Sequence, residues 1–151
     1  MNPWKASISQ AEYRALLKAP GSATAHKIKR GTPEEDLHRD VMAWVNLHLV
    51  RYPILEWLIH PPNGGKRPKG EAGKLKAMGV KPGVPDLILP LGCGQWKGLA
   101  LELKSPTNKT SPAQAAWLAR LEADGWLVGV IRTLDEAIDI LKRFLAGQRP
   151  C

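Results

Sequence analysis

The sequence predicts a single α/β domain, and three observations support this prediction. The 151-residue chain is 44% apolar, which is enough to bury one sizeable core. Gly- and Pro-rich turn signals separate apolar segments that alternate between the helical period and short β-type runs. Three Ser/Thr-x-x-Glu/Gln capping boxes mark the starts of helices. We therefore expect the order helix, strand, helix, strand, strand, helix, strand, helix.

The first expected helix begins at Thr32-Pro33-Glu34-Glu35, a capping box with proline at the first helical position. It runs for about four turns and ends near Arg51. A short basic helix is expected over Gly70 to Met78. The apolar face of the first helix consists of Leu37, Val41, Trp44, Val45 and His48.

The third and fourth helices begin at the capping boxes Ser111 to Gln114 and Thr133 to Glu136. Gly125 provides the C-terminal stop of the third helix. The expected inward faces are Trp117, Leu118 and Leu121 in the third helix, and Ala137, Ile138, Leu141 and Leu145 in the fourth.

Four segments are expected to be strands. Ile54 to His60 is followed by a loop over His60 to Pro68, where prolines and glycines break either period. Asp86 to Pro90 and Gly98 to Lys104 flank a Gly-rich turn and predict a hairpin. Trp126 to Ile131 predicts a buried strand.

The positive charge is concentrated in two parts of the chain. The net charge is +8, and residues 1–32 and 60–81 each hold six bases and one acid, so each contributes +5. Such basic blocks favour a polyanionic partner. We expect residues 1–32 to be a loosely ordered basic leader, residues 33–146 to form the domain, and residues 147–151 to be a short tail.

Two other classes of protein are disfavoured by the sequence. Uncharged stretches reach only about half the length that spans a bilayer, and residues 1–16 carry no apolar run typical of a secretory signal. Cys93 and Cys151 have no metal-ligand spacing and are expected to be free thiols. We expect a cytoplasmic protein, in a bacterial or virus-infected host cell, with no membrane partner.

The most informative feature is the pair Asp86 and Glu102, followed by Lys104. In a hairpin centred on Gly94, both acids are eight residues from the centre and face each other, with Cβ atoms about 4.5–5.5 Å apart. Two facing carboxylates are unfavourable unless a proton or a cation lies between them. Oxygen ligands select Mg²⁺ or Mn²⁺. Lys104 shares the face of Glu102 and could orient an attacking water and stabilise developing charge.

The plain alternative is that Glu102 and Lys104 form a solvated ion pair on an exposed strand face. The flanking runs Val84 to Leu89 and Leu99 to Leu103 are strongly apolar, which is typical of buried strands. Acids without partners are rare in such strands. This context favours a functional site.

Pro85-Asp86 with Glu102-Leu103-Lys104 matches the PD-(D/E)XK motif, and the chain resembles that nuclease superfamily. Its neighbouring motifs resemble, in this order, the VRR-NUC domain, over about Glu34 to Leu145. These motifs are Pro33 to Leu37, His60 to Arg67, Gly79 to Leu87, Leu101 to Lys104, and Ser111 to Trp117.

The resemblance implies a restriction-endonuclease-like αβββαβ core, a mixed sheet flanked by helices, with metal-dependent phosphodiester cleavage. Stand-alone, virus-type members of the family act as homodimers on branched DNA such as four-way junctions. By resemblance Asp86 and Glu102, with the backbone carbonyl of Leu103, are metal ligands, and Lys104 is the catalytic lysine. The resemblance also implies that Glu34 is a helix acid near the metal and that Gln114 is a site residue.

Two of these assignments have alternatives. Glu35 competes with Glu34 for the role of the helix acid, and either can be an ordinary first-turn acid at the positive end of a helix. Gln114 can simply complete its own capping box. The family usually has glutamine four residues after the helix acid, where this chain has His38.

The loop after the first expected strand predicts a phosphate-binding surface. Its glycines let backbone amides approach an anion, and its side chains supply charge-assisted donors. Basic residues downstream extend the positive field. The predicted DNA-binding residues are His60, Asn63, Gly64, Gly65, Lys66, Arg67, Lys69, Lys74 and Lys81.

Taken together, the sequence favours a Mg²⁺- or Mn²⁺-dependent, structure-selective DNA endonuclease that acts as a homodimer. One alternative is a noncatalytic nucleic-acid-binding module of the same fold. The other is a sequence-specific endonuclease of the restriction type, although about 110 core residues leave little room for a separate base-reading domain.

Overall fold

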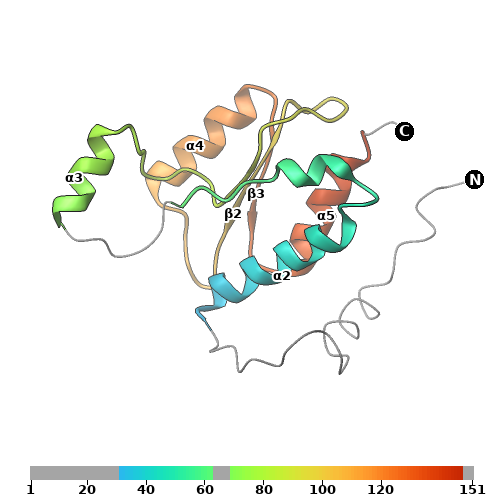
Figure 1. The fold of residues 1–151 in the computed structure, drawn as a ribbon, viewed down its shortest axis with the longest axis horizontal. Helices are drawn as coiled ribbons and strands as arrows, with labels where there is room; N and C mark the ends of the chain where they lie inside the picture. Colours follow the sequence, from blue (N-terminus) through green and yellow to red (C-terminus); the bar gives the residue numbers. More distant parts are fainter. Residues whose placement is uncertain (1–30, 63–68, 148–151) are drawn as a thin grey trace, which may run out of the picture. The chain divides into compact units, whose positions relative to one another are not determined.

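A computed structural model describes residues 31–62 and 69–147 of the chain. Its elements confirm the predicted α/β class: a three-stranded mixed sheet is flanked by helices (Figure 1). In chain order they are α2 (Pro33–His48), the 3₁₀ helix η2 (Pro53–Trp57), α3 (Lys69–Ala77), β1 (Leu87–Leu89), β2 (Leu99–Leu103), α4 (Pro112–Ala123), β3 (Leu127–Ile131) and α5 (Leu134–Leu145).

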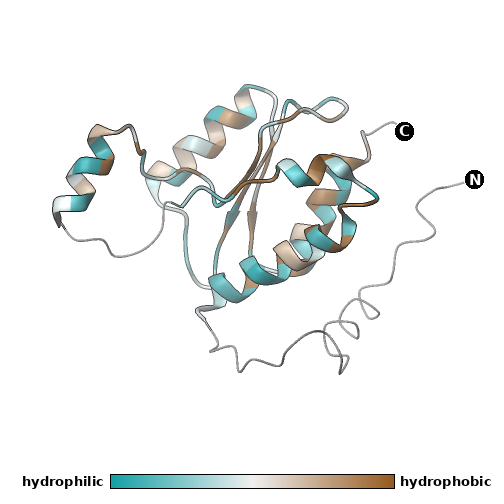
Figure 2. Cartoon of the chain, in the orientation of Figure 1, coloured by the Kyte–Doolittle hydropathy of each residue, from teal (hydrophilic) through white to brown (hydrophobic). Residues whose placement is uncertain are grey.

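The sheet has the order β1-β2-β3, with β2 in the centre. β1 pairs with β2 in antiparallel fashion, and β2 pairs with β3 in parallel fashion. Every residue of β2 is buried, because helices cover both faces of the sheet. The strands are mostly hydrophobic in Figure 2, with a hydrophilic part near one strand end. Any charged side chain on β2 is therefore held in the interior.

The predicted hairpin register is confirmed where it matters for the site. Leu87 pairs with Leu101 and Leu89 with Leu99, so one further step along the same register sets Asp86 opposite Glu102. Nearer the tip the register shifts, because Cys93 pairs with Trp96. Between these two pairs the first arm has one residue more than the second, so the hairpin closes on a two-residue turn rather than symmetrically about Gly94.

The expected strand over Ile54 to His60 is wrong for most of its length. Pro53 opens the 3₁₀ helix η2 instead, because proline fixes φ and leaves no amide for a ladder. Leu55 and Leu58, three residues apart, are both buried, which matches the period of a 3₁₀ turn. What remains of the strand is one antiparallel bridge, in which Ile59 exchanges two backbone hydrogen bonds with Ile88 of β1.

All three predicted capping boxes are present, at the starts of α2, α4 and α5. α2 ends at His48 rather than near Arg51, and the basic helix α3 starts and ends one residue earlier than expected. The buried side chains of α2 are those on the predicted face, with His48 half-buried and stacked on Trp44. α2 and α5 pack against each other and against the sheet, with Leu141 and Phe144 of α5 fully buried. This packing fixes the start of α2 near the ends of the strands.

No helix in the described parts of the chain is long and apolar enough to cross a membrane. The expected boundaries of the leader and the tail stay predictions, since residues 1–30 and 148–151 lie outside the described residues.

The turn before β1 packs tightly on the start of α4. Gly83 has a φ of +78°, and a Cβ there would lie 2.5 Å from the backbone carbon of Ala113. Beside it, the indole Nε1–H of Trp117 donates to the carbonyl of Pro82 at 3.1 Å. The turn thus links the segment that carries Asp86 to the helix that carries Gln114.

We predict that Gly83→Ala lowers the free energy of unfolding by at least about 1–2 kcal/mol, the cost of a left-handed backbone alone. Gly73→Ala is the matched control, because Gly73 lies inside α3 with nothing within 4 Å of an added Cβ. That variant should be neutral or stabilising by about 0.5–1 kcal/mol. Urea unfolding of the two variants checks this, and equal stabilities would show that the turn tolerates a side chain.

Candidate active site

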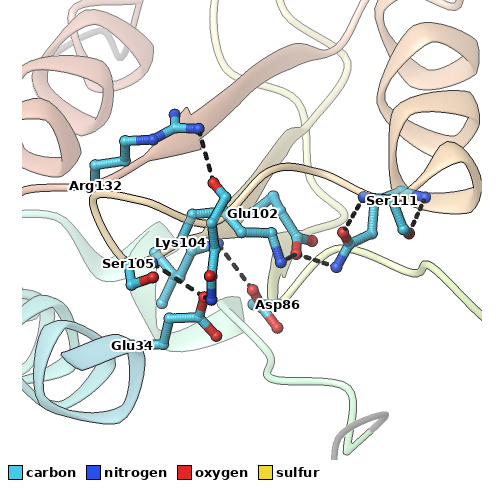
Figure 3. Close-up of polar contacts among 10 residues, drawn as sticks. Glu34, Asp86, Glu102, Lys104, Ser105, Ser111 and Arg132 are labelled. Atoms are coloured by element: carbon cyan, nitrogen blue, oxygen red, sulfur yellow. Dashed lines mark hydrogen bonds and ion pairs between the residues drawn. The ribbon is translucent and has the colours of Figure 1, made fainter. Parts of the chain in front are cut away.

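Three carboxylates from three separate elements meet at one end of the sheet (Figure 3). Asp86 directly precedes β1, Glu102 is in β2, and Glu34 is in the first turn of α2. Lys104 follows β2, and Gln114 is in the first turn of α4. The structure therefore brings together the five residues that the sequence predicted as catalytic.

Glu102 is the most enclosed of these groups, with 1% of its surface exposed. Its Oε1 accepts hydrogen bonds from the ammonium of Lys104, 2.9 Å away, and from the side-chain amide of Gln114. Its Oε2 is buried and has no hydrogen-bond partner among residues 31–62 and 69–147. Lys104 is itself 9% exposed, so the solvated surface pair that the sequence left open is wrong. One oxygen of a buried carboxylate is left for a further ligand.

The environment makes Glu102 hard to ionise. Burial raises the pKa of its carboxyl group, the hydrogen bond and charge of Lys104 oppose this rise, and the nearby Asp86 carboxylate adds to it. The net effect is to raise the pKa of Glu102 to about 7. The two facing acids thus repel each other, as the hairpin register predicted.

Asp86 is fixed through both its side chain and its backbone. Its Oδ2 accepts from the backbone N–H of Leu103 at 2.8 Å, a contact that crosses the hairpin to the neighbour of Glu102. Its carbonyl oxygen accepts from Nδ1 of His60 at 2.6 Å. Because a carbonyl can only accept, this bond places the proton of the His60 ring on Nδ1.

His38, in α2, is packed against His60. The two ring centroids are 4.3 Å apart in an edge-on arrangement. Burial lowers the pKa of His38, and the neighbouring His60 and Arg39 lower it further against the opposing charge of Asp86. His38 therefore supports the residue that holds the backbone of Asp86.

The structure distinguishes the two candidate helix acids. Glu35 completes the capping box, with its Oε2 accepting from the backbone N–H of Thr32 at 2.7 Å. The Oε1 of Glu34 instead accepts from the backbone N–H of Ser105 and from Nδ2 of Asn108, each at 3.0 Å. Glu34 is therefore the acid at the site.

Glu34 is kept ionised by its neighbours. Partial burial alone would raise its pKa, but the hydrogen bonds from Ser105 and Asn108 and the charge of Lys104 together lower it below the ordinary value. Glu34 and Glu102 are thus two carboxyl groups at one site whose pKa values are shifted in opposite directions.

Gln114 does both things that the sequence offered as alternatives. Its Oε1 accepts from the backbone N–H of Ser111 at 2.8 Å and completes the capping box of α4. Its Nε2 donates to Oε1 of Glu102. An amide has a donor end and an acceptor end, so the cap orients the amide and its donor end reaches the buried carboxylate.

The donor set fits a hard divalent cation that takes part of its coordination from outside the protein. Asp86 and Glu102 face each other with one buried oxygen unpartnered, and a cation between them would offset their repulsion. Within residues 31–62 and 69–147, no three His, Cys, Asp or Glu side chains form a ready-made metal cage. Mg²⁺ sites built on one or two carboxylates with water and phosphate oxygens have this character.

The predicted DNA-binding residues are only partly described. Asn63, Gly64, Gly65, Lys66 and Arg67 lie outside the described residues, as does the side chain of Lys69. Lys74 and Lys81 are exposed, in α3 and just after it. His60 is exposed, and its ring is hydrogen-bonded to the backbone carbonyl of Asp86 at the site.

Three residues at the site were not predicted from the sequence: Ser105, Asn108 and Arg132. Ser105 and Asn108 bind Glu34, and the guanidinium of Arg132 donates to the backbone carbonyl of Asn108 at 3.2 Å. They lie in an irregular loop and at a strand end, where no periodicity or motif spacing points to a contact 71 residues away in the chain.

The comparisons with known proteins define the class of the protein as a nuclease, a hydrolase that binds nucleic acid. The family model of the VRR-NUC domain matches residues 32–134, and the chain belongs to the VRR-NUC family. A solved VRR_NUC domain protein is similar over 78% of this chain and 92% of its own, with 28% identity and a TM-score of 0.63. No curated protein is similar enough to count as a match.

We predict that the metal-free protein loses stability as the pH rises from about 4.5 to about 7. Folded Glu102 keeps its proton up to about pH 7, whereas the unfolded chain releases it near 4.5. The folded state thus binds more protons in this window, so the free energy of unfolding falls as the pH rises, by up to about 3 kcal/mol. Urea unfolding at several pH values in EDTA measures this slope.

The neutral variant Glu102→Gln should lose this part of the pH dependence, whereas the exposed control Glu122→Gln should keep it. Equal slopes in the wild type and in Glu102→Gln would contradict the prediction.

Proposed function

We propose that the protein is a metal-dependent endonuclease that hydrolyses DNA phosphodiester bonds, with a preference for branched DNA such as four-way junctions. The observation that carries this proposal is the buried Glu102, paired with Lys104, facing Asp86 and retaining one unpartnered oxygen. Burying a carboxyl group costs folding free energy. Groups with strongly shifted pKa values are concentrated at functional sites, which favours a catalytic role for Glu102.

The cation would be Mg²⁺ or Mn²⁺, held by Asp86 and Glu102 with the backbone carbonyl of Leu103. When bound, it would neutralise phosphate charge and make water a better nucleophile. The Leu103 N–H that binds Asp86 and the Gln114 amide that binds Glu102 set the directions in which the two carboxylates point.

Hydrolysis forms a bond from phosphorus to the attacking water oxygen and breaks the bond to one ester oxygen. The water loses a proton, and the departing ester oxygen takes up a proton from solvent and leaves as a hydroxyl group. In our proposal the Lys104 ammonium, 2.9 Å from Glu102, orients the water and donates to the phosphate oxygens as negative charge develops. Glu34, which is kept ionised, accepts a hydrogen bond from the water and helps to remove its proton. In this proposal Glu34, whose pKa is lowered, acts on the water, whereas Glu102, whose pKa is raised, helps to hold the cation.

In our proposal, basic residues of the chain hold the nucleic acid. The net charge of +8 and the exposed lysines Lys74 and Lys81 supply a positive field for a phosphate backbone. We propose that the loop from His60 to Arg67 adds direct phosphate contacts, as the sequence suggests.

A noncatalytic binding module of the same fold is the other candidate class. Such a module would gain nothing from carboxylates facing a phosphate, which repel it. The complete set of Asp86, Glu102 and Lys104, with the supports that orient them, favours the enzyme.

The test is cleavage of labelled four-way, flap, duplex and single-stranded DNA, and of the RNA equivalents, in Mg²⁺, Mn²⁺ or EDTA. We predict that Asp86→Asn, Glu102→Gln and Lys104→Met each reduce cleavage by at least about a hundredfold, the loss typical when one charge-stabilising group is removed. DNA binding and folding should be retained, and Glu122→Gln should cleave as the wild type does.

Cleavage by all three variants at the wild-type rate would remove this cluster from the mechanism. Metal-independent binding without any cleavage would favour the noncatalytic module, and fastest cutting of unbranched duplex at one sequence would favour the restriction type.

We also predict that the protein acts as a homodimer on a four-way junction. A junction presents two symmetric phosphodiesters, and each chain carries one Asp86/Glu102/Lys104 site, so paired cuts need two protomers about a twofold axis. Sedimentation of the free protein and of its junction complex measures the state. A monomer in both, with single uncoupled nicks, would contradict the homodimer.

A further inference from the structure

We infer that Asn108, held in place by Arg132, is a positioning residue that fixes the carboxylate of Glu34 in the site. The inference rests on the proposed function, because it concerns how one acid of that site is oriented. It adds residues that lie outside the PD-(D/E)XK motif.

The contact is made by a tight turn between β2 and α4. The backbone N–H of Asn108 donates to the carbonyl of Ser105 at 3.2 Å and closes the turn. Ser105 is the first residue of the turn and Asn108 is the fourth. The backbone N–H of Ser105 and the side-chain Nδ2 of Asn108 both donate to Oε1 of Glu34, each at 3.0 Å. Closing the turn brings both donors to one carboxylate oxygen.

The turn is anchored from the opposite side by Arg132, which follows β3. Its guanidinium donates to the backbone carbonyl of Asn108 at 3.2 Å. Its own backbone N–H donates to Oε2 of Glu136, in the capping box of α5, at 2.6 Å. The position of Asn108 is thus tied to the start of α5 as well as to the end of β2.

Glu34 needs such support because it lies in the first turn of a helix, where a glutamate side chain is otherwise free to rotate. Two donors on Oε1 hold the carboxyl group on the side of Asp86 and Lys104, as Figure 3 shows, and both hydrogen bonds from this turn go to Oε1 rather than Oε2. A group held in one orientation reacts faster than one that must find it.

A role in packing alone is disfavoured by exposure. Asn108 is exposed, so truncating its side chain removes little buried surface. The substitution should therefore affect Glu34 rather than the fold.

The experiment measures single-turnover cleavage of a four-way junction by Asn108→Ala and Asn108→Asp. We expect losses of about tenfold for alanine, because a hydrogen bond to a charged group is lost, and about a hundredfold for aspartate, because a second carboxylate then faces Glu34. Thr107→Ala, exposed in the same turn, is the matched control and should cleave normally. A role in packing would make the isosteric aspartate the milder change.

A double-mutant cycle tests whether Asn108 acts through Glu34. In the Glu34→Ala background, adding Asn108→Ala should cause no further loss, and Arg132→Ala should likewise have no effect there. Junction binding should change little in any of these variants, so that the loss falls on the cleavage step.

The outcomes separate the two proposals. A wild type that cleaves, with Asn108→Ala as active as the wild type or additive with Glu34→Ala, overturns the positioning role alone. A wild type that cleaves no nucleic acid in Mg²⁺ or Mn²⁺ overturns the proposed function, and the positioning role with it.

Discussion

The site depends above all on the antiparallel pairing of β1 with β2. This register places Asp86 opposite Glu102, and the side chain of Asp86 then reaches back to the backbone of Leu103 across the same hairpin. Shifting the pairing by one residue would turn the side chains of one strand to the other face and separate the two acids. The hydrophobic packing of β2 between helices prevents that shift, so the stability of the core and the geometry of the site have one cause.

Much of this could be predicted from the sequence, because local patterns carry it. Capping boxes placed the starts of α2, α4 and α5, and the spacing around the Gly-rich turn gave the register at Asp86 and Glu102. The segment after α2 was mistaken for a strand, because an apolar run of that length does not distinguish a strand from a 3₁₀ turn. The position of the single bridge in this segment depends on its pairing partner, Ile88 of β1.

Contacts between distant segments were beyond sequence reasoning. The choice between Glu34 and Glu35 depends on the loop that carries Ser105 and Asn108, far away in the chain. A pattern of residues shows which side chains are available, whereas the partner that each one finds depends on how the helices pack. The dual role of Gln114 was missed for a related reason: its two ends were treated as alternatives, although an amide can donate and accept at once.

The distribution of charge explains why an acidic site can exist in a strongly basic chain. Carboxylates repel a phosphate backbone, so a nuclease site needs positive charge to bring nucleic acid near it, and here 22 basic residues outnumber 14 acidic ones. Within the site the need is the opposite one, because Glu102 is buried beside a second acid, and Lys104 and the amide of Gln114 offset its charge only in part. A divalent cation would satisfy both needs, since it offsets the repulsion between Asp86 and Glu102 and attracts the phosphate. In the function proposed above, the buried Oε2 of Glu102 is where a cation and its substrate would complete the site.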